Sequence, residues 1–290
     1  MVRYLKHTAI DRKKWDLRIE TAAMETLYPY SWYLDLVSPG WEGLVKGDYE
    51  MVMPLTRSRK FGFNFLLQPI LAQQLGIFSE NQPTRSEIGE FINSIPSTFR
   101  YIDICLNSQN PDLPEGVRYK EKVNHVLDLG TDADYNTNTN RNLQKGREHL
   151  FAFENITVDQ YLDLKYSEEN KPPVKRDYLK GLFGGLVSMK RAEVTGLFLE
   201  GDLQAAAVLG FASTRVIYMN GSSSFEGKEN RAMFVMMDQL IESSRNKYPV
   251  FDFEGSNLPG VARFFEGFGA VKTLYLRIVK TKFPFFRSRR

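Results

Sequence analysis

The sequence predicts an α/β (α+β) protein with a mixed sheet, built from two tandem copies of one unit. The chain has 290 residues, which is above the usual size of a single domain. A β-hairpin pattern, in which two apolar runs flank a Gly-Asp turn, occurs at 42–55 (EGLVKGDYEMVMPL) and again at 195–210 (TGLFLEGDLQAAAVLG). The turn residues Asp48 and Asp202 lie 154 positions apart.

Each hairpin is followed by the same order of patterns. A helical pattern comes next, at 84–95 in the first copy and at 230–246 in the second. An apolar strand pattern then follows, at 99–107 and at 249–257. A strand–helix–strand step places parallel strands beside antiparallel ones, so each unit is expected to hold a mixed sheet with helices on its faces.

Composition excludes several classes of protein. Apolar residues make up 42% and charged residues 25%, as in an ordinary folded protein, and a net charge of +3 is too small to indicate nucleic-acid binding. The single cysteine, Cys105, excludes an internal disulfide, and three scattered histidines give no metal-ligating pattern, so we expect no metal site. No apolar run resembles a signal peptide or a membrane span, so a cytoplasmic protein is expected.

The boundary between the units is expected in a polar loop near 128–140 (DLGTDADYNTNTN), which has few apolar residues. We therefore predict a first unit at 1–130 and a second at 131–290, with the functional site in the second.

A first candidate anion site lies just after that boundary, at 136–150. If Asn138 or Asn140 caps a helix there, Arg141 and Lys145 lie one turn apart on one face, beside exposed backbone amides. Such an arrangement predicts phosphate binding. The alternative is a solvated basic helix.

A second candidate anion site is the polar loop that leads into the apolar helix of the second unit. Asn220 ends the preceding strand, Gly227 is the glycine within the loop, and Asn230 and Arg231 stand at the start of the helix. A loop of this kind at a helix N-terminus can hold a phosphate or pyrophosphate. The methionines of the helix are interpreted as core residues.

Two carboxylates mark the end of the strand pattern VFDFEG. Asp252 and Glu254 share one face of the strand, whereas Phe251 and Phe253 share the other. A carboxylate on a central strand is costly unless it is hydrogen-bonded or wet, and the carboxyl ends of strands are where open α/β sheets keep their sites. Both carboxylates are therefore functional candidates. The alternative for Glu254 is to cap the next helix or to pair with Arg263.

An apolar helical stripe and a final strand pattern follow. Ser256 or Asn257 can cap the helix, and Pro259 suits its first turn. Residues 270–280 alternate like a strand. The stripe, at helical spacing, is interpreted as core and consists of Val261, Phe264, Phe265 and Phe268.

The last residues, 280–290, combine basic and phenylalanine side chains. This composition predicts a weak contact with an anionic membrane surface or RNA. The alternative is a solvated tail.

The order of elements and several motifs resemble a known superfamily. Hairpin, strand, helix and strand resemble the GNAT acyltransferase fold, and two such units in tandem resemble the Fem family of peptidoglycan aminoacyltransferases and its GNAT-like relatives. The letters that carry the resemblance are NRNLQKGRE (140–148), QPILAQQLGIF (68–78), and FDFEGS followed by GVARFFEGFGA. It spans about residues 15–280.

The resemblance implies transfer of an acyl or aminoacyl group to an amine, with no tightly bound cofactor. The donor is expected to be aminoacyl-tRNA, as in the Fem branch, or acyl-CoA, as in GNAT relatives. The strands at 216–220 and 250–254 are expected to part and admit the donor. The segment SFEGKENRA departs from the GNAT pyrophosphate loop, because it offers a single glycine, and this weakens the expectation of coenzyme A.

Aminolysis needs a proton acceptor, a proton donor and a stabiliser for the oxyanion. Glu254 is the candidate base, Asp252 the second catalytic carboxylate, and Tyr218 the candidate proton donor, with backbone amides at 218–221 polarising the carbonyl. The expected donor-binding residues are Arg141, Lys145, Asn220, Gly227, Asn230 and Arg231.

Two other functions remain open on the sequence alone. One is a non-catalytic binding or scaffold protein on a degenerate acyltransferase fold, which the single glycine of the phosphate loop favours. The other is a nucleic-acid-binding module, suggested by the basic segments at 141–147 and 280–290 but lacking aromatic RNA-binding signatures.

Overall fold

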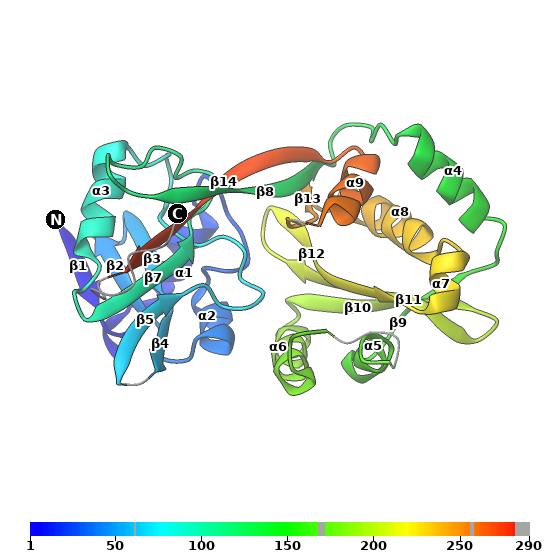
Figure 1. Cartoon of the computed structure of the whole chain (residues 1–290), viewed down its shortest axis with the longest axis horizontal. Coiled ribbons are helices and arrows are strands. Elements are labelled where there is room, and N and C mark those ends of the chain that lie inside the picture. The colour runs from blue at the N-terminus through cyan, green and yellow to red at the C-terminus, as the bar shows by residue number, and fades with distance from the viewer. Residues whose placement is uncertain (61, 168–171, 256–257, 282–290) are drawn as a thin grey trace. The chain divides into compact units, whose positions relative to one another are not determined.

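The computed structural model describes residues 1–60, 62–167, 172–255 and 258–281. The chain divides into two compact units: unit 1 comprises Met1–Val123 with Thr273–Arg290, and unit 2 comprises Asn124–Lys272. The chain enters unit 2 within strand β8 (Tyr119–Asp128) and returns to unit 1 within strand β14 (Val271–Thr281) (Figure 1). This division differs from the expected one, 1–130 and 131–290, because β14 pairs with a strand of unit 1.

Unit 1 contains two sets of paired strands. One set has the order β1-β2-β3-β6, and β4-β5-β7-β14 are successive neighbours in the other. The remaining elements of unit 1 are β1 (Val2–Leu5), η1 (His7–Ala9), α1 (Arg12–Glu20), α2 (Ser31–Val37), β2 (Glu42–Lys46), β3 (Met51–Leu55), β4 (Arg57–Lys60), β5 (Phe63–Leu67), β6 (Phe78–Ser79), α3 (Arg85–Ser94) and β7 (Phe99–Cys105).

In unit 2, the strands β8-β13-β12-β11-β10-β9 are successive neighbours. Helices α5 and α6 contact one face of these strands, and α8 and α9 lie on the other (Figure 1). The elements are α4 (Thr137–Gly146), β9 (Ala152–Asn155), α5 (Val158–Lys165), α6 (Arg176–Ser188), β10 (Ala192–Leu199), β11 (Asp202–Phe211), β12 (Arg215–Ser223), α7 (Phe225–Glu229), α8 (Ala232–Ser244), β13 (Val250–Asp252) and α9 (Pro259–Gly267).

Both predicted hairpins are present. Strands β2 and β3 pair antiparallel from Glu42↔Leu55 to Lys46↔Met51, and β10 pairs with β11 up to Leu199↔Asp202. In the second hairpin, Glu200 and Gly201 both have positive φ, 53° and 92°, as a two-residue turn that matches strand twist requires. The predicted helices and strands after the hairpins are α3, β7, α8 and β13.

The start of α4 differs from expectation. Asn136 caps the helix, because its side chain accepts a hydrogen bond from the backbone amide of Thr139, whereas Asn138 and Asn140 lie inside the helix. The expected caps of α9, Ser256 and Asn257, and the basic segment 282–290 lie outside the described residues.

The core of unit 2 is formed where α8 and α9 pack on the central strands. Phe251, Phe265 and Phe268 are buried in this core, and so are Met236 and Met237, as interpreted from the sequence. Met233, Val261 and Phe264, which were also interpreted as core, are only partly buried and line a pocket. Cys105 is buried in β7 as expected, and burial raises the pKa of its thiol to about 11. None of the described helices is long and apolar enough to span a lipid bilayer.

Candidate functional site

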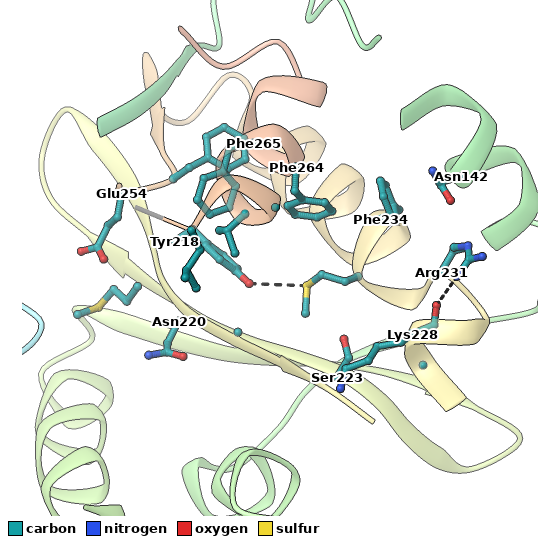
Figure 2. A pocket seen from close by; sticks show the side chains of 18 of the residues that line it. Asn142, Tyr218, Asn220, Ser223, Lys228, Arg231, Phe234, Glu254, Phe264 and Phe265 are labelled. Atoms are coloured by element: carbon teal, nitrogen blue, oxygen red, sulfur yellow. Dashed lines mark hydrogen bonds between the residues drawn. The ribbon is translucent and has the colours of Figure 1, made fainter. Parts of the chain in front are cut away.

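The site of unit 2 begins where two parallel strands part. Strand β12 pairs in parallel with β13 at only three positions, ending at Ile217↔Asp252. Beyond this point β13 stops, while β12 continues to Ser223. A pocket of about 770 Å³ opens beside the part of β12 that β13 no longer pairs with. Its wall carries residues from both chain segments, Tyr218 to Gly221 on one side and Phe253 to Gly255 on the other (Figure 2).

A β-bulge lies in this stretch of β12. The register with β11 runs Val208↔Asn220 and then Leu209↔Tyr218, so Met219 has no partner residue on β11. The bulge changes which face the following residues occupy. The ring of Tyr218 contacts Phe265 on the α9 side, whereas the side chain of Asn220 bonds to α5 on the opposite side.

Glu254 follows β13 directly and lines the pocket. Its backbone is left-handed, with φ of 59°, which is unusual for a residue with a side chain. Two hydrogen bonds hold it there: its amide donates to Asp252 Oδ1 (2.9 Å), and its carbonyl accepts from the amide of His125 (3.1 Å). The side chain keeps some exposed surface, but the surrounding protein removes it from water enough to raise the pKa of its carboxyl to about 8.

Asp252 occupies a different position from the one expected of a catalytic carboxylate. It is buried, and it does not line the pocket. Its Oδ2 accepts a hydrogen bond from Arg215 Nη1 (2.8 Å), and its Oδ1 accepts from Asn124 Nδ2 (3.0 Å) as well as from Glu254 N. Asp252 therefore holds the backbone amide of Glu254 and does not face the pocket.

Tyr218 stands on the central wall of the pocket. Its hydroxyl donates to Met233 Sδ at 3.7 Å, and burial holds the pKa of the phenol well above its usual range. The phenol therefore carries its proton at neutral pH. A Cβ atom at Gly221 would lie 1.8 Å from Tyr218 Oη, so only glycine at this position leaves room for the hydroxyl.

This close approach gives a test of Tyr218. Changing Gly221→Ala is expected to displace the Tyr218 ring. If unit 2 has the transferase activity that the sequence leads us to expect and the hydroxyl takes part in catalysis, the rate should fall by about 10-fold or more, as in Tyr218→Phe. The φ of Gly221 is not in the left-handed region, so we expect the free energy of unfolding to fall by less than about 2 kcal/mol. Kinetics and thermal unfolding of both variants check this. A fully active Tyr218→Phe variant would exclude the hydroxyl from the reaction.

The far end of the pocket is cationic. Lys228, Arg231 and Asn142 line it, and Glu254 lies at the other end, with Phe234, Phe264 and Phe265 between (Figure 2). Arg231 joins α7 to α8 with φ of 60°, and its Nη1 donates to the Lys228 carbonyl at 2.7 Å. Its Nε is buried and has no hydrogen-bond partner among the described residues. These cations at the N-terminus of α8 suit an anionic group.

The other predicted donor-binding residues are distributed unevenly. Asn220 and Gly227 line the pocket; at Gly227 a Cβ would lie 2.1 Å from the Gln204 carbonyl oxygen, so glycine allows α7 to approach β11. Asn230 lies at the end of α7 and is not part of the lining. Arg141 and Lys145 are exposed on α4 and do not line the pocket either.

Sequence reasoning missed three polar residues of the lining, Asn142, Ser223 and Lys228. Asn142 is the neighbour of Arg141 in α4, on the half-buried side of the helix. Close packing of α4 on α8, where a Cβ at Gly146 would lie 2.6 Å from Val235, turns this side toward the pocket. Lys228 belongs to the loop that was predicted to bind phosphate, and its basic side chain was a signal that could have been used.

No protein-family model matches the chain, and no curated protein sequence matches it. Solved structures share its fold. The crystal structure of FemX matches with a TM-score of 0.69 and 11% identity, over 92% of this chain and 96% of that one. L-PGS from Bacillus licheniformis matches with a TM-score of 0.58 and 12% identity, over 95% and 93% of the two chains.

A third solved structure with this fold is that of a tandem GNAT protein. The tandem GNAT protein from the clavulanic acid biosynthesis pathway, without AcCoA, matches with a TM-score of 0.56 and 10% identity, over 98% of this chain and 99% of that one. At these identities the likeness concerns the fold alone. The predicted Fem-like and GNAT-like α/β fold, in two tandem units, is confirmed.

Proposed function

We propose that unit 2 transfers an activated acyl or aminoacyl group to an amine. The observation that carries the proposal is the pocket between parted strands, with Glu254 at one end and Lys228 and Arg231 at the other. A donor R–CO–X with an anionic carrier X fits this polarity. In the reaction, R–CO–X and H₂N–R′ give R–CO–NH–R′ and HX. The C–N bond forms, the C–X bond breaks, and one amine proton is passed to X.

Each residue then has a role that follows from its position. Glu254 accepts a proton from the attacking amine, directly or through a water molecule, since a carboxyl with pKa of about 8 is a strong enough base near neutral pH. Tyr218 supplies a proton to the leaving group. Backbone amides at the bulge around Met219 stabilise the oxyanion, because the ladder with β11 is interrupted there. Asp252, held by Arg215, positions Glu254.

Two donors remain candidates. The fold shared with FemX is consistent with an aminoacyl-tRNA, and the fold shared with a tandem GNAT protein is consistent with acyl-CoA; both are analogies of fold. The proposed acceptors include the amine of a peptidoglycan precursor. With such an acceptor, the protein would act in the cytoplasm. The apolar middle of the pocket suits an acyl chain or a side chain in either case.

A donor screen tests the proposal. Acetyl-CoA, and separately alanyl-tRNA, is added to the full chain, and thermal unfolding is measured against free CoA and uncharged tRNA. A true donor at about 100 times its Kd should stabilise the chain by about 2.7 kcal/mol. The stabilisation should disappear in Arg231→Met and persist in Lys247→Met, a variant of an exposed lysine outside the pocket lining. If neither donor stabilises the chain or yields an amide product, the proposal is wrong.

A further inference from the structure

A second pocket, of about 450 Å³, adjoins the first in unit 2. The two share Tyr218, Gly221, Ser223, Lys228 and Met233 as lining residues, so they meet around the Tyr218 hydroxyl and the Met233 sulfur. The second pocket also has lining residues of its own, Lys165, Pro172 and Ser222, which the donor-binding arrangement described above does not use.

Lys165, the last residue of α5, contributes a cation to this second pocket. Its Nζ donates to Asn220 Oδ1 at 2.6 Å and lies 5.9 Å from the centre of the Tyr161 ring. Tyr161 Oη also donates to the same oxygen, at 2.9 Å, so the carbonyl of the Asn220 amide faces α5. The bulge at Met219 is what turns Asn220 to this side and fixes the ammonium at the pocket.

No carboxylate among the described residues balances the charge of Lys165. Among the described residues, neither Lys165 nor Lys228 forms an ion pair. Loss of water around Lys165 lowers the pKa of its ammonium. A partly buried charge is normally paired, so Lys165 at this pocket indicates a ligand that brings the negative charge. The exposed Lys228 adds a second ammonium group to the same lining. The hydroxyls of Ser222 and Ser223 are further hydrogen-bond donors in the same wall.

We propose that this second pocket binds the anionic group, a carboxylate or a phosphate, of the amine that accepts the acyl group, and that Lys165 and Lys228 are its two cationic contacts. This inference rests on the proposed transferase function, because it assigns the acceptor to the pocket next to the donor. The two lysines would also make the acceptor amine more reactive. Nearby ammonium groups lower the pKa of an incoming ammonium, so more of the acceptor is present as the neutral amine that can attack a carbonyl.

Binding of small amines to the full chain, without any donor, tests the inference. O-phosphoethanolamine is compared with ethanolamine, and glycylglycine with glycylglycinamide. The first pair measures the contribution of a phosphate to binding, and the second measures that of a carboxylate. By calorimetry or NMR titration, the anionic member of at least one pair should bind roughly 10- to 100-fold more tightly than its neutral partner. The preference should be lost in Lys165→Met and reduced in Lys228→Met. It should persist in Lys247→Met, which removes the same charge elsewhere.

The outcomes separate this inference from the transferase proposal. Equal binding of anionic and neutral amines, or a preference that survives Lys165→Met, overturns the inference, even if acyl transfer to neutral amines is observed. Lys165-dependent binding of the anionic amines supports it, and in that case a missing amide product from acetyl-CoA or alanyl-tRNA counts against the transferase proposal alone. Lys228 is exposed, so Lys228→Met provides a folded variant should Lys165→Met fail to fold.

Discussion

The variant Glu254→Gln is expected to transfer acyl groups about 10²- to 10⁴-fold more slowly than the natural chain, the range of a lost general base. Glutamine keeps the shape and the backbone hydrogen bonds to Asp252 and His125 but cannot accept the proton of the amine. The measurement is kcat/KM with a donor identified by the screen above. Glu229→Gln, at an exposed position outside the pocket lining, is the matched control and should leave the rate unchanged.

The pH dependence gives an independent reading of the same residue. Because the base works only when ionised, its titration should raise kcat/KM with pH until about 8, in addition to the rise that comes from forming the neutral acceptor amine. Stability should change in the opposite direction. The folded pKa of Glu254 lies above its usual value of 4.5, so the folded state holds the proton more tightly and the free energy of unfolding falls between about 4.5 and about 8. Glu254→Gln should lack both effects. A natural chain with a flat rate profile across this range would remove Glu254 from the role of base.

The second large effect concerns the ion pair behind Glu254. Changing Arg215→Met is expected to lower the free energy of unfolding by about 3–5 kcal/mol, because it leaves the carboxylate of Asp252, whose side chain is 3% exposed, buried without its cation. Methionine retains the length of the apolar stem, so packing changes little. Urea denaturation measures the loss. The double variant Arg215→Met/Asp252→Asn removes the unpaired charge and should recover part of it.

An exposed ion pair in the same unit serves as the control. Arg176 Nη2 lies 2.7 Å from Asp163 Oδ1, and the two side chains are 36% and 71% exposed. Water solvates these charges when they are separated, so Arg176→Met should cost less than about 1 kcal/mol. Similar losses in the two arginine variants would show that burial of Asp252 does not govern the energetics of its pair.

Local patterns in the sequence predicted most of the second unit. The hairpin at 195–210, the helix at 230–246 and the apolar stripe before the last strand were all recognisable, because periodicity and turn residues are local signals. The parallel pairing of the strands around Val216 and Phe251 followed from the strand–helix–strand order. The expectation that the pocket would open between these two strands came from the resemblance to the GNAT fold and not from the local patterns.

The finer geometry of the site depends on contacts between residues that are distant in the sequence. Arg215 and Asp252 are 37 positions apart, and no local pattern marks them as a pair. The left-handed backbone of Glu254 and the bulge at Met219 depend on register with β8 and β11, which spacing alone does not reveal. Asp252 was therefore predicted as a catalytic carboxylate, although the fold buries it behind the pocket.

Helix α4 forms as predicted, but the two cations that were expected to bind phosphate do not line the pocket. The spacing of Arg141 and Lys145 correctly predicted that they share a face of the helix. Which face meets the rest of the unit is decided by packing, and Leu143 and Gly146 are the buried positions. The two cations consequently point to solvent, and their neighbour Asn142 lines the pocket.

The return of β14 to unit 1 has a consequence for biosynthesis. Residues Arg277–Thr281 pair with Tyr101–Cys105, and Ile278 is buried in the core of unit 1. A nascent chain emerges from the ribosome at about 5–20 residues per second, and Arg277–Thr281 is synthesised after the last residue of unit 2, Lys272. Until this segment is synthesised, unit 1 cannot complete its sheet, and the edge of β7 that pairs with the segment stays open. An open sheet edge is prone to wrong pairing, so we expect unit 1 to depend on chaperones during this interval.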